Sequence, residues 1–342
     1  MTNKPLLIGY VGTKDLARME EDDIRALTGI NIAFGTVHDD AVVWKGEDTR
    51  DALARIREIN PEITIILSVG GWSAGGFSEA AATEEGRKTF AETSAEIVRD
   101  YGLDGLDIDW EYPMMSSAGI ASSPEDKYTF TLLLEACREE LDKLPAPRRL
   151  LTIAAGSGKY WCQNTEMEKV TPLLDYVQIM TYDMSNGYGY ITGHHTNLYQ
   201  PKQAQRESSA ELSVQDFIDH GVPAEKIVIG GAFYSHWFQG VEDDGDGYYA
   251  ESKVAGTHGP DYDQIMNDYI GKNGYKRYWD DTAKAPWIYN GENFITYDDE
   301  ESLTHKIEFV KERGLLGIMY WEYGCAIDHS LTKVMREVID KS

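Results

Sequence analysis

The chain has 342 residues, 42% of them hydrophobic, and its 58 acidic and 32 basic residues give a formal net charge of −26. This length suits one large α/β barrel, and so acidic a chain disfavours nucleic acid, anionic lipid and polyanionic glycans as partners. No apolar run reaches 18 residues, so we expect no membrane span.

The opening residues, MTNKPLLIGYVG, lack the apolar core and cleavage site of a secretory signal and are typical of a first strand. As the sequence stands this predicts a cytoplasmic protein, or a secreted one if a leader was removed. Three scattered cysteines form no disulfide framework and favour a reducing compartment. We expect a monomer.

Short β-rich runs alternate with amphipathic segments along the chain. The predicted strands cover residues 6–12, 30–37, 63–71, 105–112, 150–156, 176–183, 226–234 and 317–323. The predicted helices cover residues 48–59, 84–100, 125–144, 209–220, 300–313 and 330–340. Near-continuous Ile and Val are typical of strands buried on both faces. Eight strands alternating with helices predict an α/β fold of the (β/α)8 type, a TIM barrel.

One interval breaks this alternation. About sixty residues between Ser235 and Ile295 are rich in Tyr, Trp, Gly and Asp and contain no clear barrel helix. A connection this long usually has structure of its own. We therefore predict a barrel of residues 1–235 and 296–342, with a small α+β domain of residues 236–295 inserted after the seventh strand. That position is on the carboxyl-terminal face of the barrel, where active sites lie.

The stretch GLDGLDIDWEYP at 102–113 concentrates carboxylates in a predicted buried strand. Asp107, Asp109 and Glu111 are spaced by two, so they share one face of the strand. If the residues between them face the helices, the acids point toward the barrel axis, with Asp107 deepest and Glu111 at the mouth. Neighbouring buried carboxylates compete for protons, so the pKa of the outermost should rise, as a general acid requires.

These residues carry a family resemblance. DGLDIDWE matches D-x-x-D-x-D-x-E, the signature of family 18 glycoside hydrolases, the chitinases and their relatives. SVGG at 68–71, MTYD at 180–183 and GIMYWEYGCAID at 317–328 resemble the family's motifs on strands three, six and eight, and PWIYNGENFITYDDEES is similar to the end of the chitinase insertion domain. The resemblance implies a retaining hydrolase of β-1,4 bonds between N-acetylglucosamine units in chitin or chitooligosaccharides, with no cofactor and no metal.

The resemblance also implies roles for individual residues. Glu111 would be the general acid and base, and the substrate's own N-acetyl oxygen, rather than a protein carboxylate, would attack the sugar. Asp109 would orient the acetamide N–H, and Asp107 would share a proton with Asp109. Tyr182 would donate a hydrogen bond to the acetamide oxygen.

A larger set is expected to bind substrate, because its members close strands or match family positions. These residues are Asp183, Trp321, Tyr10, Phe34, Trp72, Gly71, Tyr112, Met180 and Tyr234. Trp321 is expected as the apolar floor under the reacting sugar, and Gly71 as closely approaching backbone. One position departs from the pattern: related chains with an insertion domain end strand seven in Tyr-x-Arg, whereas here His236 stands in place of the Arg. This leaves the sugar contacts at that position open.

Several alternatives stay open. The same chemistry could act on the chitobiose core of N-glycans or on peptidoglycan. A non-catalytic chitin-binding lectin is disfavoured because Glu111 is intact. A glycosidase using Asp109 as nucleophile is not excluded by spacing. End or interior cleavage is undecided, and we expect soluble oligomers rather than crystalline polymer as substrate.

The remaining motifs do not indicate a further functional site. The acidic turn at 242–247 does not fit a calcium loop, GSGK at 156–159 lacks the Walker spacing, and no Ser stands in a G-x-S-x-G context. His194 and His195 have no third metal ligand at useful spacing, so we expect no metal site there.

Overall fold

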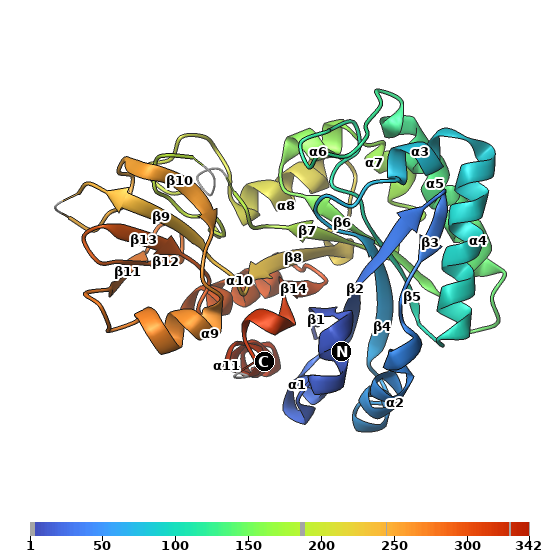
Figure 1. The fold of residues 1–342 in the computed structure, drawn as a ribbon, viewed down its shortest axis with the longest axis horizontal. Coiled ribbons are helices and arrows are strands. Elements are labelled where there is room, and N and C mark those ends of the chain that lie inside the picture. The colour runs from blue at the N-terminus through green and yellow to red at the C-terminus, as the bar shows by residue number, and fades with distance from the viewer. Residues whose placement is uncertain (1–3, 185–188, 244, 328–329, 342) are drawn as a thin grey trace.

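The computed structural model describes residues 4–184, 189–243, 245–327 and 330–341, and its centre is a closed parallel barrel (Figure 1). The barrel strands are β1 (Leu6–Gly12), β2 (Gly29–His38), β4 (Thr64–Gly70), β5 (Gly105–Asp109), β6 (Leu150–Gly156), β7 (Tyr176–Met180), β8 (Ile227–Ala232) and β14 (Gly317–Trp321). Each strand pairs in parallel with the next, and β14 pairs with β1 to close the ring. The predicted (β/α)8 barrel is confirmed.

Helices surround the barrel. They are α1 (Glu21–Ala26), α2 (Arg50–Ile59), α3 (Phe77–Ala82), α4 (Glu84–Asp100), α5 (Asp126–Asp142), α6 (Lys159–Gln163), α7 (Met167–Val170), α8 (Ala210–Asp219), α10 (Glu300–Glu312) and α11 (Ser330–Asp340). All six predicted helices are present. The helices α1, α3, α6 and α7 were not predicted, because they are too short to show a helical period. Within the described ranges, no helix combines the length and the apolar character needed to cross a membrane.

A second, antiparallel sheet lies beside the barrel and is coloured orange in Figure 1. Its strands are β9 (His236–Val241), β10 (Ser252–His258), β11 (Lys276–Asp280), β12 (Ala285–Tyr289) and β13 (Asn293–Thr296), in the spatial order β10-β9-β13-β12-β11. Phe238, Trp287 and Phe294 belong to its own small apolar cluster. The short α9 (Tyr262–Gln264) and a π-helical turn at Ile265–Tyr269 follow β10, and β3 (Ala41–Val43) forms a hairpin with β2.

Two residues of the motifs quoted above, Asp244 in the acidic turn and Asp328 after β14, lie outside the described residues.

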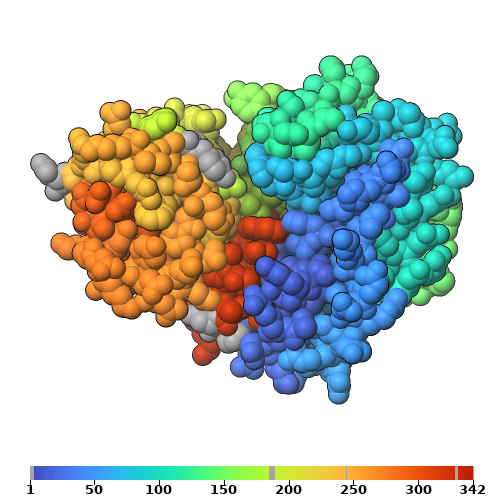
Figure 2. Space-filling view, in the orientation of Figure 1, coloured from blue at the N-terminus to red at the C-terminus, as the bar shows by residue number. Residues whose placement is uncertain are grey.

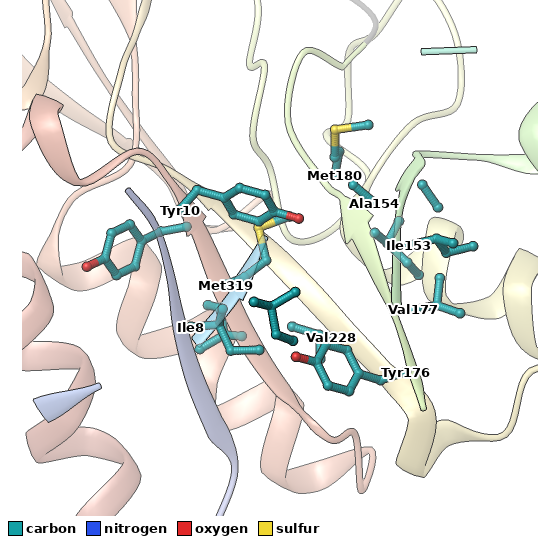
Figure 3. Packing of buried hydrophobic residues seen from close by; sticks show 14 of the residues in the cluster. Ile8, Tyr10, Ile153, Ala154, Tyr176, Val177, Met180, Val228 and Met319 are labelled. Carbon is teal, nitrogen blue, oxygen red and sulfur yellow. The ribbon is translucent and has the colours of Figure 1, made fainter. Parts of the chain in front are cut away.

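Apolar side chains fill the barrel interior and its contacts with the helices. Figure 3 shows Ile8, Val228 and Met319 among the buried side chains between the strands, with Met180 higher, at the end of β7. Ile8, Val228 and Met319 have almost no exposed surface. The polar side chains buried nearby are therefore exceptions that need a separate explanation.

Candidate active site

The strand β5 points its carboxylates into the barrel. Trp110, which follows the strand, stacks on Phe77 of α3 with ring centroids 5.5 Å apart and meets Phe130 of α5 edge-on, also at 5.5 Å. Trp110 therefore faces the helices. Because side chains alternate along the chain, Asp109 and Glu111 face the other way, toward the barrel mouth.

Asp107 is fully buried and fully hydrogen-bonded. Tyr10 Oη and Ser68 Oγ donate to its Oδ2 at 2.9 and 2.7 Å, and Thr152 Oγ1 and Gln178 Nε2 donate to its Oδ1 at 2.7 and 3.0 Å. Burial raises the pKa of Asp107, and the four donors act against this rise. Four donors occupy the lone-pair positions that a carboxylate offers, so Asp107 is held rigidly at the bottom of the row.

Asp109 lies above Asp107 in a very different setting. It is only 4% exposed, and its buried Oδ1 has no hydrogen-bond partner in the described ranges. Burial, followed by the negative charges of Glu111 and Asp107, raises the pKa of Asp109 well above its ordinary value. Among the described residues no hydrogen bond joins Asp109 to Asp107, whose oxygens are already engaged. A proton on Asp109 would therefore point toward the barrel mouth rather than toward Asp107.

Glu111 is the outermost acid and is half-buried. Burial, the largest cause, raises the pKa of Glu111 to about 7, the negative charge of Asp183 adds to the rise, and a hydrogen bond with Tyr112 acts against it. A carboxyl with this pKa holds a proton in about half of the molecules at neutral pH. It can therefore both donate and accept a proton under ordinary conditions.

Tyr182 and Asp183 follow β7 on the opposite side of the mouth. The Tyr182 ring is buried and meets the Tyr234 ring edge-on at 5.9 Å. Gly230 makes room for it, because a Cβ there would lie 2.7 Å from Tyr182 Cε1. Asp183 adopts a left-handed backbone conformation with φ of 54°, and its Oδ1 accepts a hydrogen bond from Tyr234 Oη at 2.6 Å.

Two aromatic rings at the mouth come from the last residue of β14 and from the middle of β2. Trp321 is half-buried and stacks on Phe34 with centroids 5.3 Å apart, and Tyr10 lies at a tilt 5.8 Å from it. Gly71 supports Phe34 from beneath, since its φ is 93° and a Cβ there would lie 2.6 Å from the Phe34 ring. Tyr10 is 2% exposed and its hydroxyl donates to Asp107, so it supports the acid row; a contact of its ring with a sugar stays a prediction.

The remaining predicted binding residues differ in exposure. Trp72, after β4, is 61% exposed and meets Tyr112 edge-on at 6.5 Å, so it stands at the outer rim. Met180 is buried at the end of β7. In Figure 2 a notch separates the orange sheet from the green and cyan part of the barrel at the top of the molecule.

Comparison with known proteins identifies the family. The model of glycosyl hydrolases family 18 matches residues 6–325. The chain belongs to this family. The predicted family and its glycosidase class are thereby confirmed.

The relatives of this family 18 chain are similar over most of it. The solved structure of a family 18 N-acetylglucosaminidase from Paenibacillus barengoltzii shares 46% identity, covers 98% of this chain and 99% of its own, and has a TM-score of 0.95. Chitinase A1 of Niallia circulans is 38% identical over 79% of this chain, which spans 42% of the relative's length. The class V chitinase of Arabidopsis thaliana is 31% identical over 83% of this chain and 75% of its own.

In this family 18 chain the departure at His236 has a clear structural consequence. His236 is the first residue of β9, is fully buried, and places its Nε2 2.7 Å from Asp183 Oδ1. His195 stacks on it at 4.3 Å, with its Nδ1 3.8 Å from the same oxygen. Burial would raise the pKa of Asp183, but the two imidazoles outweigh this and hold it well below its ordinary value. Sequence spacing offered His195 no third ligand group, but in the structure Asp183 and His236 lie beside it, because the fold brings separate segments together.

Sequence reasoning also missed the polar floor under the acids. Thr152 and Gln178 donate to Asp107, and Asn31 Nδ2 donates to Gln178 Oε1 at 2.8 Å. A signal was available, since each is an isolated polar residue within an apolar strand. Such a residue is costly to bury unless it has a partner.

Proposed function

We propose that the chain is a retaining glycoside hydrolase that cleaves β-1,4 bonds between N-acetylglucosamine units, with Glu111 as its general acid and base. The observation that carries the proposal is the environment of Glu111, a half-buried carboxyl at the barrel mouth whose pKa is raised to about 7. Membership of family 18 supports the same reading.

In the proposed first step, the Glu111 carboxyl donates its proton to the glycosidic oxygen and the bond from that oxygen to C1 breaks. The carbonyl oxygen of the substrate's 2-acetamido group forms a new bond to C1 from the opposite face, giving an oxazolinium ring. Asp109 accepts a hydrogen bond from the acetamide N–H, and the Tyr182 hydroxyl donates a hydrogen bond to the acetamide oxygen. In the second step the Glu111 carboxylate takes a proton from water, whose oxygen attacks C1 and opens the ring, so the configuration is retained.

The geometry supports this division of roles. Asp109 has a buried oxygen to which no described residue donates a hydrogen bond, so an acetamide N–H would satisfy a group that is otherwise costly to bury. Within the described part of the chain, the Tyr182 hydroxyl has only a weak contact with Met319 Sδ at 3.9 Å, which leaves it able to donate to a ligand. Asp107, whose oxygens are engaged, is proposed to fix the base of the row rather than to exchange protons.

The substrate is proposed to be a short chitooligosaccharide. The half-buried Trp321 would underlie the reacting sugar, and Trp72 at the rim would meet a neighbouring sugar. The similarity to an N-acetylglucosaminidase over 99% of that chain favours release of single N-acetylglucosamine units from chain ends. We also propose residues 236–295 as an insertion domain that forms one wall of the groove, and a monomer as the functional unit.

The test is hydrolysis of fluorogenic N-acetylglucosaminide, chitobioside and chitotrioside by the wild type and by Glu111→Gln. Loss of several orders of magnitude in kcat is expected for Glu111→Gln, while Glu62→Gln, at an exposed position, should match the wild type. Cleavage of the monosaccharide substrate as fast as the longer ones would favour end-directed action.

Matched glucosides without the 2-acetamido group separate the two mechanisms. They should not react if the acetamide is the nucleophile. Their hydrolysis at a comparable rate would instead support Asp109 as nucleophile. If no chitooligosaccharide reacts, glycan-array binding and assays on N-glycan cores and peptidoglycan distinguish a lectin from an enzyme with another substrate.

A further inference from the structure

The cluster formed by Asp183, His195 and His236 offers a donor set that hydrolysis does not require. We propose that these three side chains form a binding site for a divalent transition-metal ion, Cu²⁺ or Zn²⁺, on the wall of the active-site mouth. The inference goes beyond the proposed glycosidase activity and does not depend on it.

The three donor atoms converge. His236 Nε2 lies 2.7 Å and His195 Nδ1 lies 3.8 Å from Asp183 Oδ1. One ligand atom from each of the three residues lies within 4.8 Å of the others. Ligand atoms at metal bonds of 2.0–2.2 Å stand about 3 Å apart, so shifts of about 1 Å per side chain would bring the three atoms into coordination.

The state of His195 is an independent observation that points to a ligand. Its side chain is fully buried, yet neither ring nitrogen has a hydrogen-bond partner among the residues that the structure describes. Buried polar atoms are almost always satisfied, and each exception calls for an explanation. A metal ion bound to Nδ1 would satisfy the nitrogen that faces Asp183.

The surrounding structure holds His195 in place. Its neighbour Thr196 donates a hydrogen bond from Oγ1 to Asp298 Oδ2 at 2.8 Å and accepts one from Lys306 Nζ at 2.6 Å. All three of these residues are fully buried. A ligand whose backbone is fixed this firmly loses little entropy when it binds an ion.

The chemistry of the donors sets the class of ion. Two imidazole nitrogens and one carboxylate suit copper, zinc or nickel, whereas calcium and magnesium prefer all-oxygen sites. The Asp183 side chain is 40% exposed, which leaves an open side for water. An Arg at position 236, as in the family pattern, could not act as a ligand.

Occupation of this site would affect substrate binding. The ion would engage Asp183, which is expected to contact the sugar, and it would bring positive charge toward Glu111. We expect a reversible, substrate-competitive inhibition by Cu²⁺ that a chelator relieves.

The decisive measurement is direct binding of Cu²⁺ at pH 7 in a non-coordinating buffer. Titration calorimetry measures the affinity and stoichiometry, and electron paramagnetic resonance identifies the ligands. Wild type should bind one Cu²⁺ with nitrogen hyperfine structure, and His195→Asn and His236→Arg should each lose this signal. His236→Arg can still donate to Asp183, so it tests the ligand without removing the hydrogen bond that holds the carboxylate. The exposed His38, substituted as His38→Asn, is the matched control and should bind as the wild type does.

Circular dichroism of each variant checks that loss of binding is not loss of folding. The proposal is overturned if wild type binds no stoichiometric Cu²⁺ or Zn²⁺, or if His236→Arg binds Cu²⁺ with the same affinity and spectrum. Because binding is read without substrate, the result stands whether or not the chain hydrolyses chitooligosaccharides.

Discussion

Replacing Glu111 by Gln should make the folded protein more stable while it abolishes the proposed activity. A carboxyl whose pKa rises from 4.5 to about 7 on folding destabilises the folded state once it is ionised. At roughly 1.4 kcal/mol per pKa unit, the cost is about 3 kcal/mol above pH 8. The amide of Gln has no charge to desolvate, and it also removes the repulsion that Glu111 exerts on Asp109.

The sign of the pH dependence follows from proton binding. Between the unfolded and folded pKa values the folded state holds more protons than the unfolded state, so the stability of the wild type falls as pH rises. The advantage of Glu111→Gln should therefore be about 1 kcal/mol at pH 5 and should level off near 3 kcal/mol above pH 8.

Scanning calorimetry of the two proteins at pH 5, 7 and 8.5 measures this difference. For a chain of this size, 3 kcal/mol corresponds to roughly 4 °C in Tm. The exposed Glu62→Gln serves as control and should show no such trend. An advantage that is the same at every pH, or a variant less stable than the wild type at pH 8.5, would refute the assignment of a raised pKa to Glu111.

Three further predictions concern the walls and supports of the site. In Asp183→Asn the fall of kcat/KM at high pH should begin at a lower pH, because the negative charge of Asp183 helps to raise the pKa of Glu111. A pH-rate series in which this fall stays at the same pH would contradict the prediction. Trp321→Ala should raise KM for a chitobioside about tenfold through the lost ring contact, with some loss of Tm because the ring also packs on Phe34, and an unaltered KM would remove Trp321 from the binding surface. Lys306→Met leaves Asp298 buried and unpaired, so urea unfolding should show a loss of about 3–5 kcal/mol, part of which Asp298→Asn should restore in the double variant.

The barrel and the row of acids could be predicted because both follow from patterns among residues close together in the sequence. The period of two in Asp107, Asp109 and Glu111 specifies a shared face whatever the distant contacts are. The Ile and Val runs and the helical periods are equally local, and even the boundaries of β1 and β6 agree with those expected. By contrast, the cis peptide bonds before Phe34 and Tyr112 have no signal in composition or spacing.

What could not be predicted depends on where distant segments meet. Tyr10 closes a strand, and from sequence alone an aromatic residue there could either face a sugar or hold Asp107. The barrel closure between β1 and β14 brings its ring to 5.8 Å from that of Trp321, and its hydroxyl donates to Asp107. His195 and His236 are 41 positions apart, on a loop and on the first strand of the second sheet, so no spacing rule could bring them together.

His236 also shows why the second sheet matters to the chemistry. As the first residue of β9 it belongs to that sheet, in which it pairs with Thr296 of β13, yet its imidazole contacts Asp183 at the end of the barrel strand β7. Asp183 in turn raises the pKa of Glu111 across the mouth. A change in the position or charge of the second sheet's first residue is thus transmitted to the general acid through a single carboxylate. The Arg-to-His departure therefore changes more than one sugar contact, because the residue at position 236 contacts the same carboxylate that raises the pKa of Glu111.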